Sequence, residues 1–267
     1  MSLLRDVYPV LLRTDLAVQF QYRAAMIIWL IGLVIQPIVY LAVWLTVAKS
    51  QGGAVGGFTG ADFSAYYIAY MVVNHLTFTW FMFEFEYRVR SGAFSPLLLQ
   101  PLHPIHRDIA SNIAYKLLTM VLVLPVTALL IWVFSPRFAL QLWALLAFVP
   151  SLILAFLLRF FVEWALALAA FWTTRVDAIN QVFFAVMLFL AGRMAPLELM
   201  PNWVQTLAYW SPFPWMVAFP VDLLLGKLTW EQTVEGLIAQ AAWSLLALAL
   251  LSVVWKRGVK AYAAVGS

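Results

Sequence analysis

Long apolar stretches decide what this chain can fold into. A helix needs roughly 20 apolar residues to cross a bilayer. Six apolar segments stand out in this chain; five meet this length clearly, and the remaining one is shorter. None alternates apolar and polar residues as the strand of a membrane barrel does. With 65% hydrophobic and 10% charged residues, the chain also has more apolar surface than a water-soluble core can bury. We therefore predict an all-α polytopic membrane protein, one domain over residues 1–267, whose six transmembrane helices cover residues 24–48, 63–87, 109–134, 140–172, 178–191 and 233–255.

Lysine and arginine are divided unevenly between the two sides that these spans define. If the amino terminus is cytoplasmic, eleven of the 16 basic residues fall inside and four outside, and Arg159 lies within a span. This bias requires an even number of crossings, with both termini on the inner side. The net charge of +4 is therefore a signal of topology and not of a nucleic-acid surface.

The segment before the first span, residues 1–23, has an apolar face and a charged one. We interpret it as an amphipathic helix on the inner leaflet, although an ordinary polar lead-in to the first span remains the alternative. The apolar face is formed by Leu3, Val7, Leu11 and Val18.

The sequence lacks the motifs of the common catalytic sites. There is no cysteine, and the three histidines, His75, His103 and His106, do not have the spacing of a zinc-binding motif. Neither a G-x-S-x-G elbow nor a G-x-x-x-x-G-K-[ST] phosphate loop is present, so the chain cannot hydrolyse ATP by itself in the P-loop manner. We predict no catalytic residue, no metal and no cofactor in this chain.

Two opposite charges lie within the fourth span. Arg159 and Glu163 are four residues apart, so they share a face of the helix. A lone charge at bilayer depth is energetically costly, and we therefore expect the two side chains to pair. The pair is either a polar point on a translocation path or a structural contact between helices. A helix over residues 140–172 would be about 50 Å long, so the pair could also lie near a headgroup, or Pro150 could break the helix.

Between the second and third spans lies a cytoplasmic loop, residues 88–107, with unusual apolar content. Glu86 and Arg90 form an i, i+4 pair where it begins, as do Glu84 and Arg88. A solvated loop rarely exposes many leucines, so this loop is expected to dock to a soluble partner or to the bilayer surface. The leucines concerned are Leu97, Leu98, Leu99 and Leu102.

Prolines repeatedly interrupt the apolar segment over residues 192–226. Such a segment cannot be one straight membrane helix, and irregular backbone survives at membrane depth only when it is packed in protein or lines a wet cavity. We predict an external re-entrant hairpin of two short helices, beginning near Pro201 and Pro214, that caps the bundle and acts as a gate. The gate prolines are Pro196, Pro201, Pro212 and Pro214.

The order of these features resembles a known family. "LAGRMAPLELMPNWVQTLAYWSPFPWMVAFPVDLLLGKL", "RSGAFSPLLLQPLHPI" and the ending "KRGVKAYAAVGS" are similar to segments of ABC-2 type (export-class) permeases of ATP-binding-cassette transporters. The compact six-span bacterial branch without a fused ATPase is the most similar. The individual motifs are degenerate, and their order over nearly the whole chain carries the resemblance.

The resemblance implies a permease that forms half of an export pathway in a bacterial inner (plasma) membrane. A separate P-loop ATPase dimer, which binds ATP and Mg, would dock below, and a second permease, identical or paralogous, would complete the path. The residues implied in ATPase docking are Glu86, Arg90, Gly92, Leu98, Gln100 and Pro101. The candidates for the translocation path are Asn74, Phe78, Phe81, Phe184 and Met187, together with Arg159 and Glu163.

Two other functions stay open at this point. A secondary transporter would favour several buried acids and inverted repeats, whereas Glu163 is the one serious mid-span acid and no repeat is evident. A membrane-embedded lipid-modifying enzyme would need polar catalytic residues clustered at one depth. Lipids, glycans, drugs and peptides are all candidate substrates of the predicted permease.

Overall fold

The computed structural model of the chain describes residues 2–173 and 176–262. Its described part is helical apart from loops and one small hairpin, β1 (Ala54–Val55) with β2 (Phe58–Thr59). The helices are α1 (Ser2–Gln21), α2 (Arg23–Ser50), α3 (Gly60–Thr77), α4 (Phe81–Arg90), α5 (Ser95–Leu98), α6 (Ile105–Phe134), α7 (Leu142–Ala167), α8 (Asp177–Leu190), α9 (Asn202–Tyr209), α10 (Phe213–Met216), α11 (Ala218–Leu224) and α12 (Trp230–Ala261), with short 3-10 turns η1 (Leu168–Phe171) and η2 (Leu197–Leu199).

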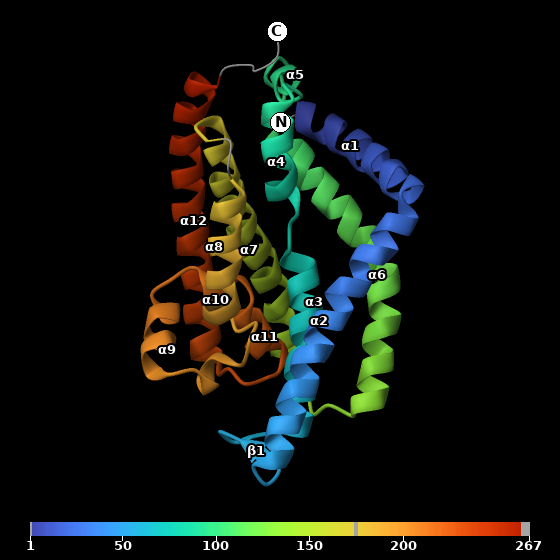
Figure 1. Cartoon of the computed structure of the whole chain (residues 1–267), viewed down its shortest axis with the longest axis vertical. Helices are drawn as coiled ribbons and strands as arrows, with labels where there is room; N and C mark the ends of the chain where they lie inside the picture. The colour runs from blue at the N-terminus through green and yellow to red at the C-terminus, as the bar shows by residue number, and fades with distance from the viewer. Residues whose placement is uncertain (1, 174–175, 263–267) are drawn as a thin grey trace.

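The long helices form an elongated bundle (Figure 1). Helices α1 and α5 and the last turns of α12 lie at one end, and the β1–β2 hairpin lies at the other. Among the described residues, four helical stretches are long and apolar enough to cross a membrane: α2, α6, α12 and the run from Leu142 to Phe171, which joins α7 to η1. Helix α8 is a shorter apolar helix. The prediction of an all-α polytopic membrane protein is confirmed.

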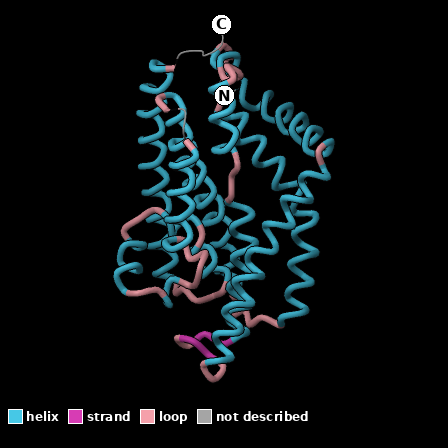
Figure 2. The backbone as a smooth tube through the Cα atoms, viewed as in Figure 1, coloured by secondary structure: helices cyan, strands magenta, loops and turns pink. Residues whose placement is uncertain are grey.

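The second predicted span, residues 63–87, is divided between two helices. Helix α3 ends at Thr77 and α4 begins at Phe81, so the chain between them is a loop in the middle of the bundle (Figure 2). The backbone leaves the helical conformation at Phe78, where ψ is 142°. By contrast, α7 continues through Pro150 without a break.

The proline-rich segment, residues 192–226, folds into more pieces than the two predicted helices. It contains η2, α9, α10 and α11, grouped on one side of the bundle (Figure 1). Pro201 directly precedes α9 and Pro214 is the second residue of α10, where a missing N–H costs no helical hydrogen bond. Helix α11 packs against α7 and α3, which holds this segment to the core.

Helix α1 lies against α6 at the end of the bundle that holds α5. The hydroxyl of Tyr8 is 2.9 Å from Nδ1 of His106, and the two rings meet edge to face. The segment predicted to lie on the inner leaflet is thus a helix with a direct contact to the start of α6, just beyond the loop 88–107.

Candidate functional site

Buried and partly buried polar side chains converge on the interruption between α3 and α4. They come from three elements, the end of α3 and its following loop, α6 and α7, and they lie midway along the bundle. We call this group the mid-bundle cluster; it consists of Asn74, Thr77, Thr79, Asn112, Lys116, Arg159 and Glu163.

Arg159 is at the centre of the cluster. Its Nε donates to Oε1 of Glu163 at 2.8 Å, and the two side chains are 3% and 0% exposed. Its Nη1 donates to Oδ1 of Asn74 at 2.9 Å and to Oγ1 of Thr77 at 3.2 Å, and the guanidinium lies 5.2 Å from the centre of the Phe78 ring. The structure therefore brings together four predicted pathway residues: Asn74, Phe78, Arg159 and Glu163.

Lys116 and Glu163 provide partners for the interrupted backbone and its side chains. Nζ of Lys116 donates to the carbonyl oxygen of Phe78 at 2.7 Å, and the hydroxyl of Thr79 donates to Oε2 of Glu163. A backbone carbonyl left without a partner at membrane depth costs several kcal/mol. The α3–α4 break can persist inside the bundle because α6 and α7 supply these contacts.

The loop 88–107 is held to the bundle by an aromatic cluster. The Phe94 ring lies 4.9 Å from Phe85 of α4 and 5.5 Å from Phe171 of η1, measured between ring centres. The hydroxyl of Tyr262, just after α12, is 2.9 Å from Oγ of Ser95. This loop-anchoring cluster consists of Phe85, Phe94, Trp164, Phe171, Trp255 and Tyr262, and it joins the loop to α4, α7, η1 and α12.

Ionic contacts surround the root of the same loop. Arg88 pairs with Asp108 at 2.9 Å, and Oδ2 of Asp108 also accepts from the Trp164 indole at 2.9 Å. The structure thus gives Arg88 a partner on α6 in place of the predicted Glu84. Glu86 pairs with Arg90 at 3.2 Å, in the spacing that the sequence indicates.

His103 is partly buried against two aromatic rings of the loop-anchoring cluster. Its ring centre is 4.3 Å from that of Trp255 and 5.7 Å from that of Trp164, and its Nδ1 accepts from the backbone N–H of Ile105 at 3.2 Å. Burial lowers the pKa of His103, and the nearby His106 lowers it further. The neutral ring is therefore the form that fits this place.

The predicted docking residues differ in their exposure. Gln100 and Pro101 are exposed, whereas Leu98 is partly buried against the core. Leu99 is 88% exposed and is the leucine that the loop turns outward. Gly92 adopts a φ of 73°, a left-handed conformation that suits glycine and lets the chain turn out of α4.

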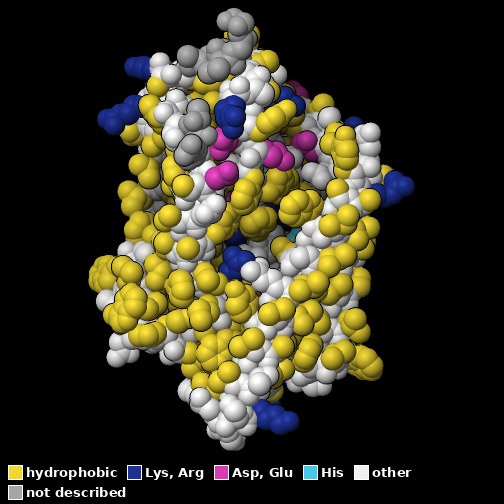
Figure 3. Space-filling model, in the orientation of Figure 1, with side chains coloured by type: hydrophobic (Ala, Val, Ile, Leu, Met, Phe, Trp, Pro, Cys, Tyr) yellow, Lys and Arg dark blue, Asp and Glu magenta, His cyan; other side chains and the backbone are white. Residues whose placement is uncertain are grey.

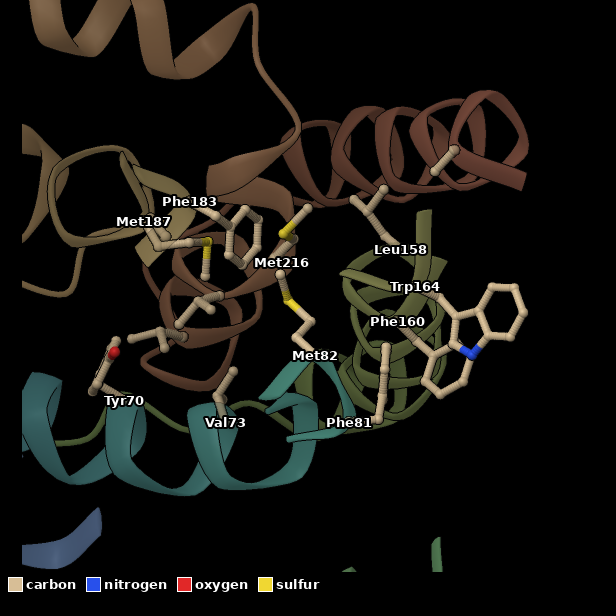
Figure 4. Close-up of a cluster of buried hydrophobic side chains, with 14 of the residues drawn as sticks. Tyr70, Val73, Phe81, Met82, Leu158, Phe160, Trp164, Phe183, Met187 and Met216 are labelled. Carbon is tan, nitrogen blue, oxygen red and sulfur yellow. The ribbon is translucent and has the colours of Figure 1, made fainter. Parts of the chain in front are cut away.

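The remaining predicted pathway residues lie apart from the mid-bundle cluster. Phe81 is 2% exposed and packs on Phe160 of α7. Met187 is 4% exposed and points into the space between α8, α10 and α3, near Phe183 and Met216 (Figure 4). Phe184 stacks on Phe83, a residue that the sequence analysis did not single out, and Phe83 is 54% exposed.

Side chains of α2 and α3 hold the beginning of the proline-rich segment. The Tyr66 hydroxyl donates to the carbonyl of Gly192 at 2.6 Å. The carbonyl of Met194 accepts from the Tyr67 hydroxyl at 2.7 Å and from the Trp44 indole N–H at 2.9 Å. Among the predicted gate residues, Pro196 and Pro214 are buried, Pro212 is partly buried and Pro201 is exposed.

The comparisons with known proteins identify a family. Residues 24–266 match the family described as ABC-2 family transporter protein. Neither the curated proteins nor the solved structures include a match to this chain. The matched region covers nearly the whole sequence and includes the mid-bundle cluster, the loop 88–107 and the proline-rich segment. The chain therefore belongs to the ABC-2 family of transporter proteins and is a multi-pass membrane permease.

Proposed function

We propose that this chain is the membrane subunit of an ATP-driven exporter and is powered by a separate P-loop ATPase that docks on the loop 88–107. The observation that best supports this is the construction of the loop. Its inner face is fixed to four elements by the loop-anchoring cluster, while Leu99, Gln100 and Pro101 remain exposed. An exposed leucine on a rigidly anchored loop suits a surface that receives force from a partner.

The interruption between α3 and α4 gives that force a place to act. Helix α4 is continuous with the loop, and only residues 78–80 connect it to α3. Movement of the loop would carry α4 with it and bend the chain at this connection. The mid-bundle cluster would then change its contacts, since Arg159 donates to Asn74 on α3 and Lys116 donates to the carbonyl of Phe78 in the connection itself.

This function sets an orientation and a list of partners. The loop, α1 and the end of α12 would be cytoplasmic, and the proline-rich segment would be the external gate, in a bacterial inner membrane. Two ATPase subunits would bind ATP and Mg, and a second permease, identical or paralogous, would complete the pathway. The +4 net charge and its distribution along the sequence favour this orientation.

The test is ATP turnover in a complex reconstituted from this chain and its ATPase. Leu99→Asp places a charge on the docking surface, and we expect ATPase co-purification and permease-stimulated turnover to fall by about tenfold or more, a loss typical of a buried interface anchor. Leu140→Asp is the matched control, because Leu140 is also exposed, at 53%, but lies before α7 and far along the chain from the loop. Unchanged turnover with Leu99→Asp and Gln100→Ala would contradict the docking assignment. Gradient-driven transport by this chain alone would favour a secondary transporter instead.

A further inference from the structure

A groove of about 460 Å³ lies between α4 and the beginning of α8. It is close to the loop 88–107, at the end of the bundle that we propose to be cytoplasmic. Several acidic side chains lie close together in the upper half of this face, above the central hollow (Figure 3). The groove is lined by Phe83, Glu86, Tyr87, Arg90, Ser91 and Asp177.

The wall formed by α4 is aromatic. Phe83 and Tyr87 are four residues apart and share one face of the helix, and they are 54% and 73% exposed. Phe83 also stacks on Phe184 of α8, whose ring is parallel to it within 1° at a centre-to-centre distance of 5.6 Å. Two aromatic rings are thus presented to whatever occupies the groove.

The charged groups of the groove favour a positive ligand. Among the described residues that line the groove, two carboxylates, those of Glu86 and Asp177, lie beside one guanidinium, that of Arg90. Glu86 is already engaged, since Oε1 pairs with Arg90 at 3.2 Å and Oε2 accepts from the backbone N–H of Val176 at 3.2 Å. Asp177 is exposed and adds a negative charge beyond this pair.

Aromatic faces beside a carboxylate are the chemistry by which proteins bind organic cations. The negative face of an aromatic ring attracts a cation within about 6 Å, and the attraction is greatest for cations that shed water easily, such as quaternary ammonium groups. A small hydrated metal ion would gain little from the rings, and an anion would be repelled by the carboxylate of Asp177.

We infer that this groove is the entry site for the transported molecule and that the molecule is a lipophilic organic cation, such as an aromatic or quaternary onium compound. This inference rests on the proposed function, since it names the class of substrate that the permease would take. The cation reaches the groove from the inner leaflet or the cytoplasm. Tyr87 and Phe83 contact its apolar groups, and Asp177 compensates its charge.

The test is direct binding to the purified full-length chain in lipid nanodiscs, without ATPase. Tetraphenylphosphonium and tetraphenylborate have nearly the same size and shape and opposite charges, so comparing them isolates the sign of the charge. We expect saturable binding of tetraphenylphosphonium above that of empty nanodiscs, and no saturable binding of tetraphenylborate. Equal or tighter binding of tetraphenylborate would overturn the inference, and so would the absence of saturable tetraphenylphosphonium binding.

Substitutions then locate the site. Tyr87→Ala is expected to weaken tetraphenylphosphonium binding by about tenfold, whereas Tyr87→Phe, which keeps the ring, is expected to change it by less than about twofold. Asp177→Asn is expected to weaken it by about threefold to fivefold. The controls are Trp132→Ala and Glu235→Gln, which change an exposed aromatic and an exposed acid outside the groove. Binding that responds to the controls as much as to Tyr87→Ala would place the cation elsewhere.

These outcomes are separate from those of the proposed function. Leu99→Asp tests the coupling of the chain to its ATPase, and we expect it to leave cation binding to the isolated chain in nanodiscs unaffected. If the complex hydrolyses ATP and depends on Leu99 but does not bind tetraphenylphosphonium, the substrate class is wrong and the permease function stands. If the cation binds but no ATPase couples to the chain, the assignment of the cation site is supported and the proposed ATP-driven function is wrong.

Discussion

Arg159 donates to Glu163 across 2.8 Å, one turn apart on α7, and neither side chain is more than 3% exposed. The pair faces the break between α3 and α4, where Asn74 and Thr77 both accept from Nη1 of the guanidinium. Through Arg159, the pair joins α7 to α3 within one chain. They stabilise the place where the second predicted span is interrupted, and this is also the place where we propose that the chain bends.

We expect Glu163→Gln to destabilise the protein by about 3–5 kcal/mol, because it leaves the buried charge of Arg159 uncompensated. Thermal unfolding in detergent measures the effect as a lower midpoint. Replacing both members, Arg159→Met with Glu163→Met, is expected to cost less than Glu163→Gln alone, since no buried charge remains. The control is Glu198→Gln, whose pair with Lys227 is partly exposed and is worth at most about 1 kcal/mol. A Glu163→Gln midpoint equal to that of the control would show that Arg159 does not depend on this carboxylate.

Lys116→Met should free the carbonyl of Phe78, which accepts from Nζ at 2.7 Å. Loss of this partner is expected to cost about 1–3 kcal/mol, because the carbonyl stays buried. Hydrogen exchange of the amides over residues 78–83 should become faster, with smaller changes in α12. Lys49→Met, at the exposed end of α2, is the control and should leave exchange near the break as it is. Unchanged exchange in Lys116→Met would mean that Lys116 does not support the break.

Gly192→Ala should be much more damaging than Gly52→Ala, although both glycines have positive φ, 75° and 83°. A side chain at either position incurs a left-handed conformational cost of about 1–2 kcal/mol. At Gly192 the new methyl group would also collide with the Tyr66 hydroxyl, which donates to the Gly192 carbonyl, whereas nothing lies within 4 Å at Gly52. Thermal unfolding of the two variants makes the comparison. Equal losses would show that Tyr66 moves aside freely and does not hold the proline-rich segment.

Acidification should destabilise the loop 88–107 through His103. Its pKa in the folded chain lies below the ordinary value of 6.5, so the unfolded chain binds the proton more readily. The contribution of the neutral ring to stability is therefore complete above about pH 6.5 and is lost progressively as the pH falls below that value. Protonation also removes the lone pair that accepts from Ile105. We expect the thermal midpoint of His103→Gln to fall less than that of the wild type between about pH 7.5 and pH 5.5. Identical slopes would assign the pH dependence to other groups.

The sequence was sufficient for the class of fold and for the family. Long apolar runs determine membrane helices because lipid leaves the backbone no other way to satisfy its hydrogen bonds. That requirement is local, so it can be read from a window of residues. The order of motifs likewise indicated the ABC-2 family, which the match over residues 24–266 confirms.

The break after α3 could not be read in the same way. Phe78, Thr79 and Trp80 look like part of an ordinary aromatic span, and the partners that stabilise the break, Lys116 and Glu163, are 38 and 84 residues away in sequence from the groups they bind. Proline, the usual signal of interruption, is present within α7 at Pro150, where the helix continues.

Which face of each short helix is exposed also depended on three-dimensional context. Helix α4 begins at Phe81, which sets its phase so that Phe81 packs on α7 and Phe83 faces the groove. In the loop, a run of three leucines does not reveal which one points outward, and the end of α5 at Leu98 leaves Leu99 exposed. The sequence pattern selects Phe81 and Leu98, whereas the exposed side chains are those of Phe83 and Leu99, one or two positions away.

The sidedness of the chain tests the central claim most directly. The sequence contains no cysteine, so single cysteines can be introduced without background labelling. Leu99→Cys reports the loop 88–107, and Asn202→Cys, an exposed position that begins α9, reports the proline-rich segment. With a membrane-impermeant maleimide, we expect right-side-out vesicles to label Asn202→Cys alone and inverted vesicles to label Leu99→Cys alone. Labelling of both positions from the same side, or of Leu99→Cys from the outside, would contradict the assignment of an internal docking loop and an external gate.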